Sequence, residues 1–272
     1  MKIKKILNNN AVVVLEDERE KIAIGAGIAF NKKRNDIVNR EKIEKIFVMR
    51  ENDKLQQLLS RIPEEHFIIS EEVITYAEDH MGTKLNDHIH IVLTDHLSFA
   101  IERVREGIHL NNKLLHEIKI LYRREFEIGL WAIQHIKEKC QVEMPEDEAA
   151  FIALHIHTMK PQGGDLHDTV RQTTIIRDMV QSIRRHLNIT IEDDDISYHR
   201  LITHLRFTLT RMNQYGFHTM DEEMLVMIQK KFPLSYSCAV EVAKELIELH
   251  EVELPEQELG YIALHIERLR KP

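Results

Sequence analysis

PEDEAAFIALHI, residues 145–156, occurs a second time as PEQELGYIALHI, residues 255–266. Eight of the twelve positions are identical, and the two copies lie 110 residues apart. A shorter pair precedes them at an offset of 108: HLSFAIER at 96–103 and HLRFTLTR at 204–211. Two matched motifs at nearly one offset indicate a duplicated module. The sequence therefore predicts two tandem domains that share one fold.

The repeated modules have the apolar spacing of helices, three and four residues apart. Pro145 and the acidic residues after it mark a helix start, because the first turn leaves its amide hydrogens unused. We expect all-α helical bundles at 64–166 and 170–272, with residues 160–168, which hold a Pro and two Gly, as the linker. The expected helices cover residues 68–80, 95–105, 114–122, 128–139 and from 145 onward, then 175–187, 196–212, 222–231, 238–251 and 256–270.

The composition is that of a globular protein. The chain has 272 residues, of which 43% are hydrophobic, enough for two or three compact domains. No apolar run approaches the roughly 20 residues that span a bilayer, and the first residues lack the apolar core of a signal peptide. Cys140 and Cys238 are too few for a disulfide framework. We expect a cytoplasmic protein that does not insert into membranes.

Charge is distributed unevenly along the chain. Residues 1–50 hold 12 Lys and Arg against 7 Asp and Glu, a balance of +5. The net charge of the whole chain is −8, so residues 51–272 have a balance of −13. A basic head on an acidic body suggests that any polyanion binds to the head. The alternative is an asymmetry without function in a short domain.

The head, residues 1–55, has the pattern of a small antiparallel sheet. Strands are expected at 2–7, 11–15, 21–24 with a resumption at 28–30, and 42–49. The three Asn between the first two strands suit a turn, because Asn tolerates left-handed backbone angles. So small a sheet is marginal alone, and we expect the head to dimerise. The predicted class is a multidomain α and β protein, a dimeric β head followed by two helical modules.

The loop after the third strand is the candidate binding segment of the head. Gly25-Ala26-Gly27 lacks the third Gly and the following helix of a nucleotide loop, so its glycines are expected to permit a bulge or a close approach. Phe30 then precedes Asn31-Lys32-Lys33-Arg34. An aromatic ring beside amides and cations suits RNA, with bases stacked on the ring and cations at phosphates. Alternatively, Phe30 fills the small core and the basic run is a solvated loop.

Four histidines recur at matched places: His96 and His155 in the first module, His204 and His265 in the second. A packing role explains any one of them, and duplication copies structural residues too. An imidazole also binds metal, acts as acid or base, or attacks phosphorus. The metal and hydrolase interpretations are weak, because the His-x-His pairs point to different helix faces and no HExxH motif occurs. We therefore expect no metal site, no cofactor and no catalytic residues.

The order and content of these segments resemble a known family along essentially the whole chain. KIKKILNNNAVVV at 2–14, GAGIAFNKKRND at 25–36 and the duplicated histidine motifs resemble the BglG/SacY family of transcriptional antiterminators. GAGIAFNKKRND, HIHIVLTDHLSFAIER at 88–103 and GLWAIQHIKEK at 129–139 are similar to the branch that regulates sucrose operons.

The resemblance implies a dimeric four-stranded head that grips an RNA hairpin in its minor groove. Bound there, the head would prevent a competing terminator hairpin in the leader of a sugar-utilisation operon. Many relatives have Arg where this chain has Ala26. The cationic side-chain contact of that Arg is absent here, which affects which hairpin is recognised but not RNA binding itself. By position, the implied RNA surface comprises Lys5, Asn8, Asn10, Gly25, Ala26, Gly27, Phe30 and Asn31.

The resemblance also implies that the four repeated histidines accept phosphoryl groups. The donors would be the phosphocarrier protein HPr and a sugar-specific transporter component of the phosphotransferase system. Asp95 is expected to orient the His96 ring, and because Thr203 stands at the matching position, the two sites are expected to differ. The first module would be the off switch with His96 its main acceptor. The chain would be a regulator and not an enzyme; the alternative is a signalling protein that acts through protein contacts alone.

Arg103 and Arg211 lie seven residues beyond the first histidine of each module. Seven residues are two helical turns, so each arginine is expected on the face of its histidine and near it.

Overall fold

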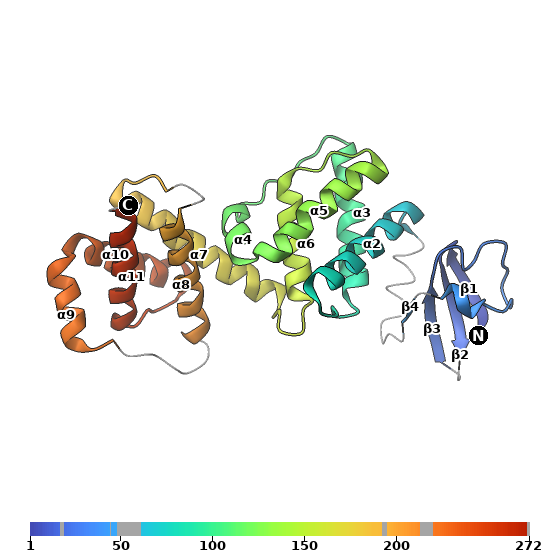
Figure 1. Ribbon diagram of the computed structural model, residues 1–272, viewed down its shortest axis with the longest axis horizontal. Coiled ribbons are helices and arrows are strands. Elements are labelled where there is room, and N and C mark those ends of the chain that lie inside the picture. Colours follow the sequence, from blue (N-terminus) through green and yellow to red (C-terminus); the bar gives the residue numbers. More distant parts are fainter. Residues whose placement is uncertain (17–18, 44, 48–60, 192–194, 213–219, 271–272) are drawn as a thin grey trace. The chain divides into compact units, whose positions relative to one another are not determined.

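The computed structural model describes residues 1–16, 19–43, 45–47, 61–191, 195–212 and 220–270. The chain divides into two compact units. The first comprises Met1–Asn111 and Glu127–Gly163, and the second comprises Asn112–Phe126 and Gly164–Pro272. Figure 1 follows the chain from the strands of the head to the helices of the second module. Leu and Ile three and four residues apart at 55–62 also favour a short helix, but residues 55–60 of that stretch lie outside the described residues.

The head is the predicted antiparallel sheet, with its strands in the order β1-β2-β3-β4. The Asn turn closes the first hairpin, where the Asn8 side chain accepts a hydrogen bond from the Asn10 amide at 2.9 Å. A short 3-10 helix, Arg40–Lys42, precedes the last strand, so the part of β4 that is described is shorter than the sequence indicated. The strands are β1 (Lys2–Asn8), β2 (Ala11–Glu16), β3 (Arg19–Ile24) and β4 (Lys45–Phe47).

Strand β2 is apolar and buried from Ala11 to Val14 because both faces of the sheet are covered. Successive side chains of a strand point to opposite faces. One face packs under the loop that follows β3, through Val12, Val14, Ile28, Ala29 and Val38. The other face carries Ala11, Val13, Ile22 and Ile24, which cluster with Phe67 of the first module.

The prediction that a strand resumes at 28–30 is wrong, because these residues form turns. Gly27 has a left-handed φ of +61°, which glycine adopts without a Cβ clash. The Ile28 amide donates to the Gly25 carbonyl at 3.1 Å, and the Phe30 amide to the Gly27 carbonyl at 3.2 Å. The turns bury Ile28 and leave Phe30 64% exposed.

The helices predicted in the first module are all present. Their shared apolar core draws on α2, α3, α5 and α6. The helix around the first repeated motif begins at Glu146, directly after Pro145, as its start signal indicated. The elements are α2 (Glu64–Met81), α3 (Ile89–Arg105), α4 (Leu115–Leu121), α5 (Arg123–Cys140) and α6 (Glu146–Thr158).

The second module repeats this plan around its own core. Its first helix begins at Leu166, inside the segment expected to be linker, because the Asp165 side chain caps the amides of His167 and Asp168. A capping carboxylate satisfies amides that the first turn leaves unpaired. The elements are α7 (Leu166–Leu187), α8 (Ile196–Met212), α9 (Glu222–Lys231), α10 (Pro233–His250) and α11 (Glu256–Arg270). Three of these helices, α7, α9 and α11, are longer than their counterparts in the first module.

The helix α4 lies in the sequence of the first module but packs in the second unit, against α7 and α8. Arg206 of α8 donates to the Leu121 carbonyl at 3.0 Å, and its guanidinium lies 5.3 Å from the Tyr122 ring centre. The Tyr122 hydroxyl is 3.4 Å from that of Thr173 on α7. The span 64–166 is therefore interrupted at residues 112–126.

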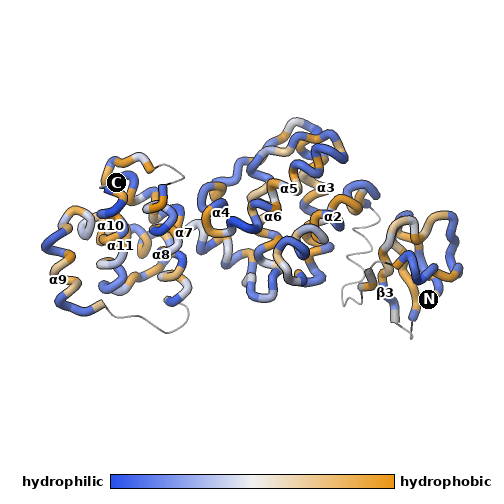
Figure 2. Tube along the Cα trace, in the orientation of Figure 1, coloured by the Kyte–Doolittle hydropathy of each residue, from blue (hydrophilic) through white to orange (hydrophobic). Residues whose placement is uncertain are grey.

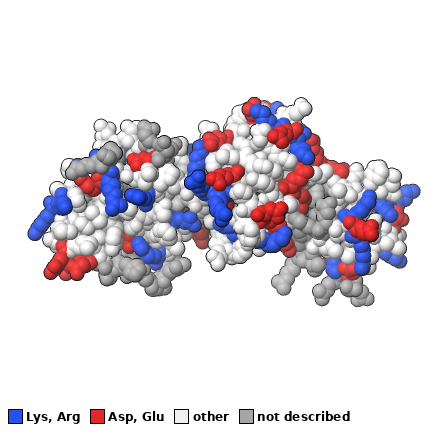
Figure 3. All heavy atoms as spheres, in the orientation of Figure 1, with Lys and Arg blue, Asp and Glu red and all other residues white. Residues whose placement is uncertain are grey.

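Hydropathy and charge follow this architecture. In Figure 2, hydrophobic and hydrophilic segments alternate along the helices of each module, as expected of helices with one buried face. Figure 3 shows acidic and basic side chains interspersed on the visible face of each module. No helix among the described residues is long and apolar enough to cross a membrane.

Candidate functional site

Each module brings its two repeated histidines together by crossing two helices. On the earlier of the two helices (α3 or α8) the histidine precedes an arginine by seven residues. On the later helix (α6 or α11) a glutamate precedes the histidine by seven residues. Seven residues are two turns, so each pair lies along one helix face. An antiparallel crossing then sets histidine beside histidine and arginine beside glutamate.

In the first module the crossing helices are α3 and α6. The rings of His96 and His155 have their centres 4.9 Å apart and are tilted by 42°. Nε2 of His96 lies 3.5 Å from Oε2 of Glu148. Glu148 is fully buried and forms an ion pair with the buried Arg103. The ring of Phe151 completes the group, 6.0 Å from that of His96.

In the second module α8 and α11 build the same arrangement. The rings of His204 and His265 lie 4.7 Å apart, closer to parallel at 27°. Nε2 of His204 lies 3.6 Å from Oε2 of Glu258. Arg211 reaches both oxygens of Glu258, at 3.0 and 3.2 Å, and the Thr208 hydroxyl donates to the same carboxylate at 2.8 Å.

Burial keeps these imidazoles neutral. Loss of solvent, the neighbouring His155 and the Arg103 charge lower the pKa of His96 to about 3. Burial and Arg211 lower the pKa of His204 to about 4, and burial lowers that of His155. A buried ring disfavours the charged form. At neutral pH each ring therefore keeps an unprotonated nitrogen that can attack an electrophile such as phosphorus.

The carboxylate beside the acceptor ring is Glu148 and not Asp95. Asp95 is exposed, and adjacent residues on a helix do not face each other. The expectation that Asp95 orients His96 has no support in these contacts. Arg103 lies on the predicted face but acts through Glu148. Both glutamates were visible in the sequence as the fourth residue of each repeated motif.

The residues expected to contact RNA divide into an exposed set and a supporting set. Lys5, Ala26, Phe30 and Asn31 are exposed. Asn10 and Gly25 are buried, while Asn8 and Gly27 are half-buried.

Asn10 holds the loop in place. Its side-chain oxygen accepts from the Gly27 amide at 2.6 Å, and its carbonyl accepts from the Gly25 amide at 2.9 Å. Asn31 sits at a left-handed φ of 57°. The turn presents Phe30 to solvent, and it is also held by the Asn9 carbonyl, which accepts from the Ala29 amide at 2.9 Å.

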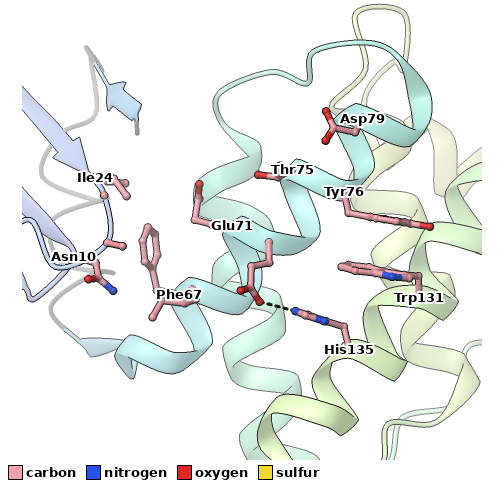
Figure 4. A pocket seen from close by; sticks show the side chains of 13 residues that line it. Asn10, Ile24, Phe67, Glu71, Thr75, Tyr76, Asp79, Trp131 and His135 are labelled. Atoms are coloured by element: carbon pink, nitrogen blue, oxygen red, sulfur yellow. Dashed lines mark hydrogen bonds and ion pairs between the residues drawn. The ribbon is translucent and has the colours of Figure 1, made fainter. Parts of the chain in front are cut away.

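A second polar cluster lies on α2 and α5 beside a hollow of about 590 Å³. Figure 4 shows the Tyr76 and Trp131 rings lying face to face, with their centres 3.8 Å apart. The ring of His135 stacks on Trp131 at 4.7 Å and bonds to Glu72 at 2.5 Å. The rings pack α2 onto α5 and were not predicted from the sequence.

Comparisons with known proteins agree with these domains. The CAT RNA binding domain model matches residues 1–56, and the PRD domain model matches residues 71–159 and 177–269. The chain is 37% identical to the transcription antiterminator LicT of Bacillus subtilis, over all of this chain and 99% of LicT. It is 36% identical to the beta-glucoside operon antiterminator of Dickeya chrysanthemi, over 99% of this chain and 97% of that protein.

The chain belongs to the BglG family of transcriptional antiterminators. A solved structure agrees with that assignment: the crystal structure of GlcT CAT-PRDI matches 59% of this chain and 98% of its own, with a TM-score of 0.55 and 36% identity. The head is thus a CAT RNA-binding domain and the helical modules are PRD domains. The predicted family is confirmed, and so is the predicted fold class of a small antiparallel sheet followed by two helical modules; the dimeric state of the head stays a prediction.

Proposed function

We propose that the head of this antiterminator binds an RNA hairpin that overlaps a terminator in the leader of a sugar-utilisation operon. The observation that carries the proposal is the loop that holds the bulky aromatic Phe30 64% exposed. An exposed ring stacks on a base at little cost to the fold. Lys5 and Asn31 are also exposed on the head and add a cation and an amide. Ala26 contributes its backbone, and Asn8, Asn10, Gly25 and Gly27 shape the loop.

The RNA-binding unit in this proposal is a homodimer. The sheet face with Ala11, Val13, Ile22 and Ile24 is apolar, and a sheet of this size is marginal alone. A twin head would cover that face. Within one chain the same face clusters with Phe67, so the two partners would compete for it.

Phe30→Ala in the full chain tests the RNA surface. Loss of a stacked base costs about 1–3 kcal/mol, so binding to a leader hairpin should weaken by roughly fivefold to a hundredfold in a gel-shift titration. Leu15→Ala is the matched control, because Leu15 is also an exposed apolar residue of the head. Equal weakening by both variants, or loss of dispersed amide signals in the Phe30 variant, would contradict a stacking role.

The four histidines are proposed as phosphoryl acceptors from HPr and a sugar-specific transporter component. Transfer breaks the bond that joins the phosphoryl group to its donor as a neutral imidazole nitrogen forms a nitrogen–phosphorus bond, and the ring releases its proton to solvent or to the departing donor group. Phosphorylation adds close to two negative charges. At His96 those charges would meet Glu148, 3.5 Å from the ring nitrogen, and compete for Arg103. The cluster then has two arrangements, in which Arg103 forms an ion pair either with Glu148 or with the phosphoryl group. Phosphorylation of His96 would thereby change how α3 packs on α6.

A terminator–reporter fusion tests the sign of the first module. His96→Asp adds a negative charge and should give low read-through even with inducing sugar. His96→Ala removes the nitrogen that accepts the phosphoryl group, so this position stays uncharged and read-through should be independent of the sugar. His88→Ala is the control, since His88 is an exposed residue at the start of the same helix. A His96→Ala strain that stays fully sugar-dependent would show that the first module is not the inhibitory one.

Sucrose is the proposed inducer, on the three stretches that resemble the sucrose branch. A beta-glucoside is the alternative, because one relative of 36% identity is named for a beta-glucoside operon. The same reporter, induced with either sugar, separates them. A protein that signals through protein contacts alone is the other alternative, and it predicts no hairpin affinity in the gel shift.

A further inference from the structure

The two histidine clusters share their centre but differ at the rim. With offsets of 108 and 110, the positions of Val92 and Thr158 in the first module correspond to Arg200 and Arg268 in the second. Arg200 lies four residues before His204 on α8, and Arg268 lies three residues after His265 on α11. Residues three and four apart share a helix face. Both arginines therefore belong to the face of the histidine pair.

The structure places Arg200 at the pair, and Arg268 lies close enough for its charge to act on His265. Arg200, His204 and His265 line one open hollow of about 430 Å³. Burial, His204 and then the charges of Arg268 and Arg200 lower the pKa of His265 to about 4. Both arginines are exposed, so a ligand from solvent can reach them together with the rings.

The corresponding rim of the first module carries no such cations. Val92 is apolar, and the Thr158 hydroxyl is turned back onto its own helix, where it donates to the carbonyls of Leu154 and His155. Beside His96 the exposed charge is Asp95, which is negative, and the second module has Thr203 there. The residues around the two pairs thus favour opposite charges.

We propose that Arg200 and Arg268 make the His204–His265 pair an anion receptor, which binds a phosphoryl group before and after transfer, and that the His96–His155 pair lacks this receptor. The inference rests on the proposed role of the histidines as acceptors. Guanidinium groups suit phosphate oxygens because they are always charged and present several donors in a plane. Arg211 is held by Glu258 in the centre of the cluster, so the rim arginines supply the additional charge.

The receptor has a chemical consequence for the modified ring. A phosphohistidine hydrolyses when its ring nitrogen is protonated, because the neutral imidazole is then the leaving group and water supplies the oxygen. Two neighbouring arginines pair with the phosphoryl oxygens and oppose the departure of that group from the ring. The second module should therefore retain its phosphoryl group longer than the first.

The first experiment uses inorganic phosphate as a probe and needs no protein donor. The full chain, labelled at its histidine rings, is titrated with phosphate and followed by NMR. We expect saturable shifts of His204 and His265, with smaller and linear shifts of His96 and His155. Arg200→Val with Arg268→Thr, which installs the residues of the first module, should weaken binding about tenfold, as expected for two exposed charged contacts. Lys230→Val removes one exposed charge from α9 and should leave binding unchanged.

The reciprocal variant guards against a double variant that fails to fold. Val92→Arg adds one rim cation to the first module at a half-buried position, and should give His96 a measurable phosphate response. Equal shifts at all four histidines, or shifts in the second module that survive the double substitution, would overturn the proposal.

The second experiment uses phosphoramidate as a small phosphoryl donor. Its nitrogen–phosphorus bond breaks as the ring nitrogen attacks, ammonia leaves, and the ring releases its proton to solvent. Mass spectrometry at intervals after removal of phosphoramidate should show slower loss of phosphate from the second module, and the double arginine variant should abolish the difference. If HPr modifies none of the four histidines while these results hold, the acceptor role fails but the anion receptor stands. Equal lifetimes in both modules would overturn the receptor.

Discussion

The two PRD modules bring together the same four groups, two histidines, an arginine and a glutamate, but support them differently. In the first module Arg103 is 8% exposed, and the carboxylate of Glu148 has Arg103 as its close partner. In the second, Arg211 is 30% exposed, and Thr208 adds a hydroxyl to Glu258. Ala100 stands where the second module has Thr208. A duplicated cluster can therefore keep its geometry while one copy depends on a single ion pair and the other on several contacts.

Glu148→Gln is expected to show the largest difference between the modules. The substitution leaves Arg103 buried without its counter-charge, which costs about 3–5 kcal/mol. Glu258→Gln keeps an oxygen that can accept from Thr208 and leaves a more exposed arginine, so its cost should be about 1–2 kcal/mol. Hydrogen exchange of the amides in α3 and α6, compared with α8 and α11, measures each module within the full chain. Equal loss of protection in both would contradict the comparison.

The close helix contacts differ in a second, smaller way. A Cβ at Gly129 on α5 would lie 2.2 Å from the Ala149 carbonyl oxygen of α6, so backbone must move. Ala239 occupies the matching position in the second module. There the glycine is Gly260, where a Cβ meets the Met220 sulfur at 2.8 Å and a Leu225 methyl at 2.9 Å. Those are ends of flexible side chains, which can shift.

Gly129→Ala should therefore destabilise the first module by about 1–3 kcal/mol through overpacking. Gly260→Ala should cost less than about 1 kcal/mol, because the alanine also favours the helix. Thermal unfolding of the two variants, followed by the protection of α5 and α11, makes the comparison. A larger effect at Gly260 would show that Met220 and Leu225 are fixed as firmly as backbone.

Sequence reasoning located the helices and the histidine pairs because both follow from short-range periodicity and from the duplication itself. It missed the role of Glu148 by weighting adjacency, although neighbours on a helix point apart and residues seven apart align. The turn at residues 25–31 depends on hydrogen bonds that the amides of Gly25 and Gly27 donate to Asn10, which precedes Gly27 by seventeen residues. No local pattern reveals these bonds.

The position of α4 was equally hidden from the sequence. Its own residues predict a helix, but its partners Thr173 and Arg206 lie 51 and 85 residues away from the groups they contact. Its counterpart α9 packs on α10 and α11 of its own module. Helical propensity is local, while the surface that a short helix covers is decided by tertiary contacts.

The smallest expected difference is in the pH response of the two pairs. Burial lowers the pKa of His96 to about 3 and that of His204 to about 4, against about 6.5 for the unfolded chain. Between these values the unfolded state binds the proton and the folded state does not. The contribution of each ring to the free energy of unfolding is therefore at its maximum above pH 6.5. It falls by about 1.4 kcal/mol per pH unit below that pH. For His204 the fall should end near pH 4, and for His96 it should continue toward pH 3.

Ring titration by NMR in the full chain measures this order directly. His96 should remain neutral at pH 5, and so should His204, but at pH 4 only the second ring should be half protonated. His96→Gln and His204→Gln each remove one titrating group, so each should flatten the loss of stability between pH 6.5 and 5 by a similar amount. If His96 titrates near pH 6.5, its ring is open to water, and the neutral nitrogen on which phosphoryl acceptance depends is not a product of burial. If both rings titrate at the same pH below 5, burial alone sets the pKa of the histidine in each module. The different partners of Glu148 and Glu258 then have no effect on the pKa of the rings.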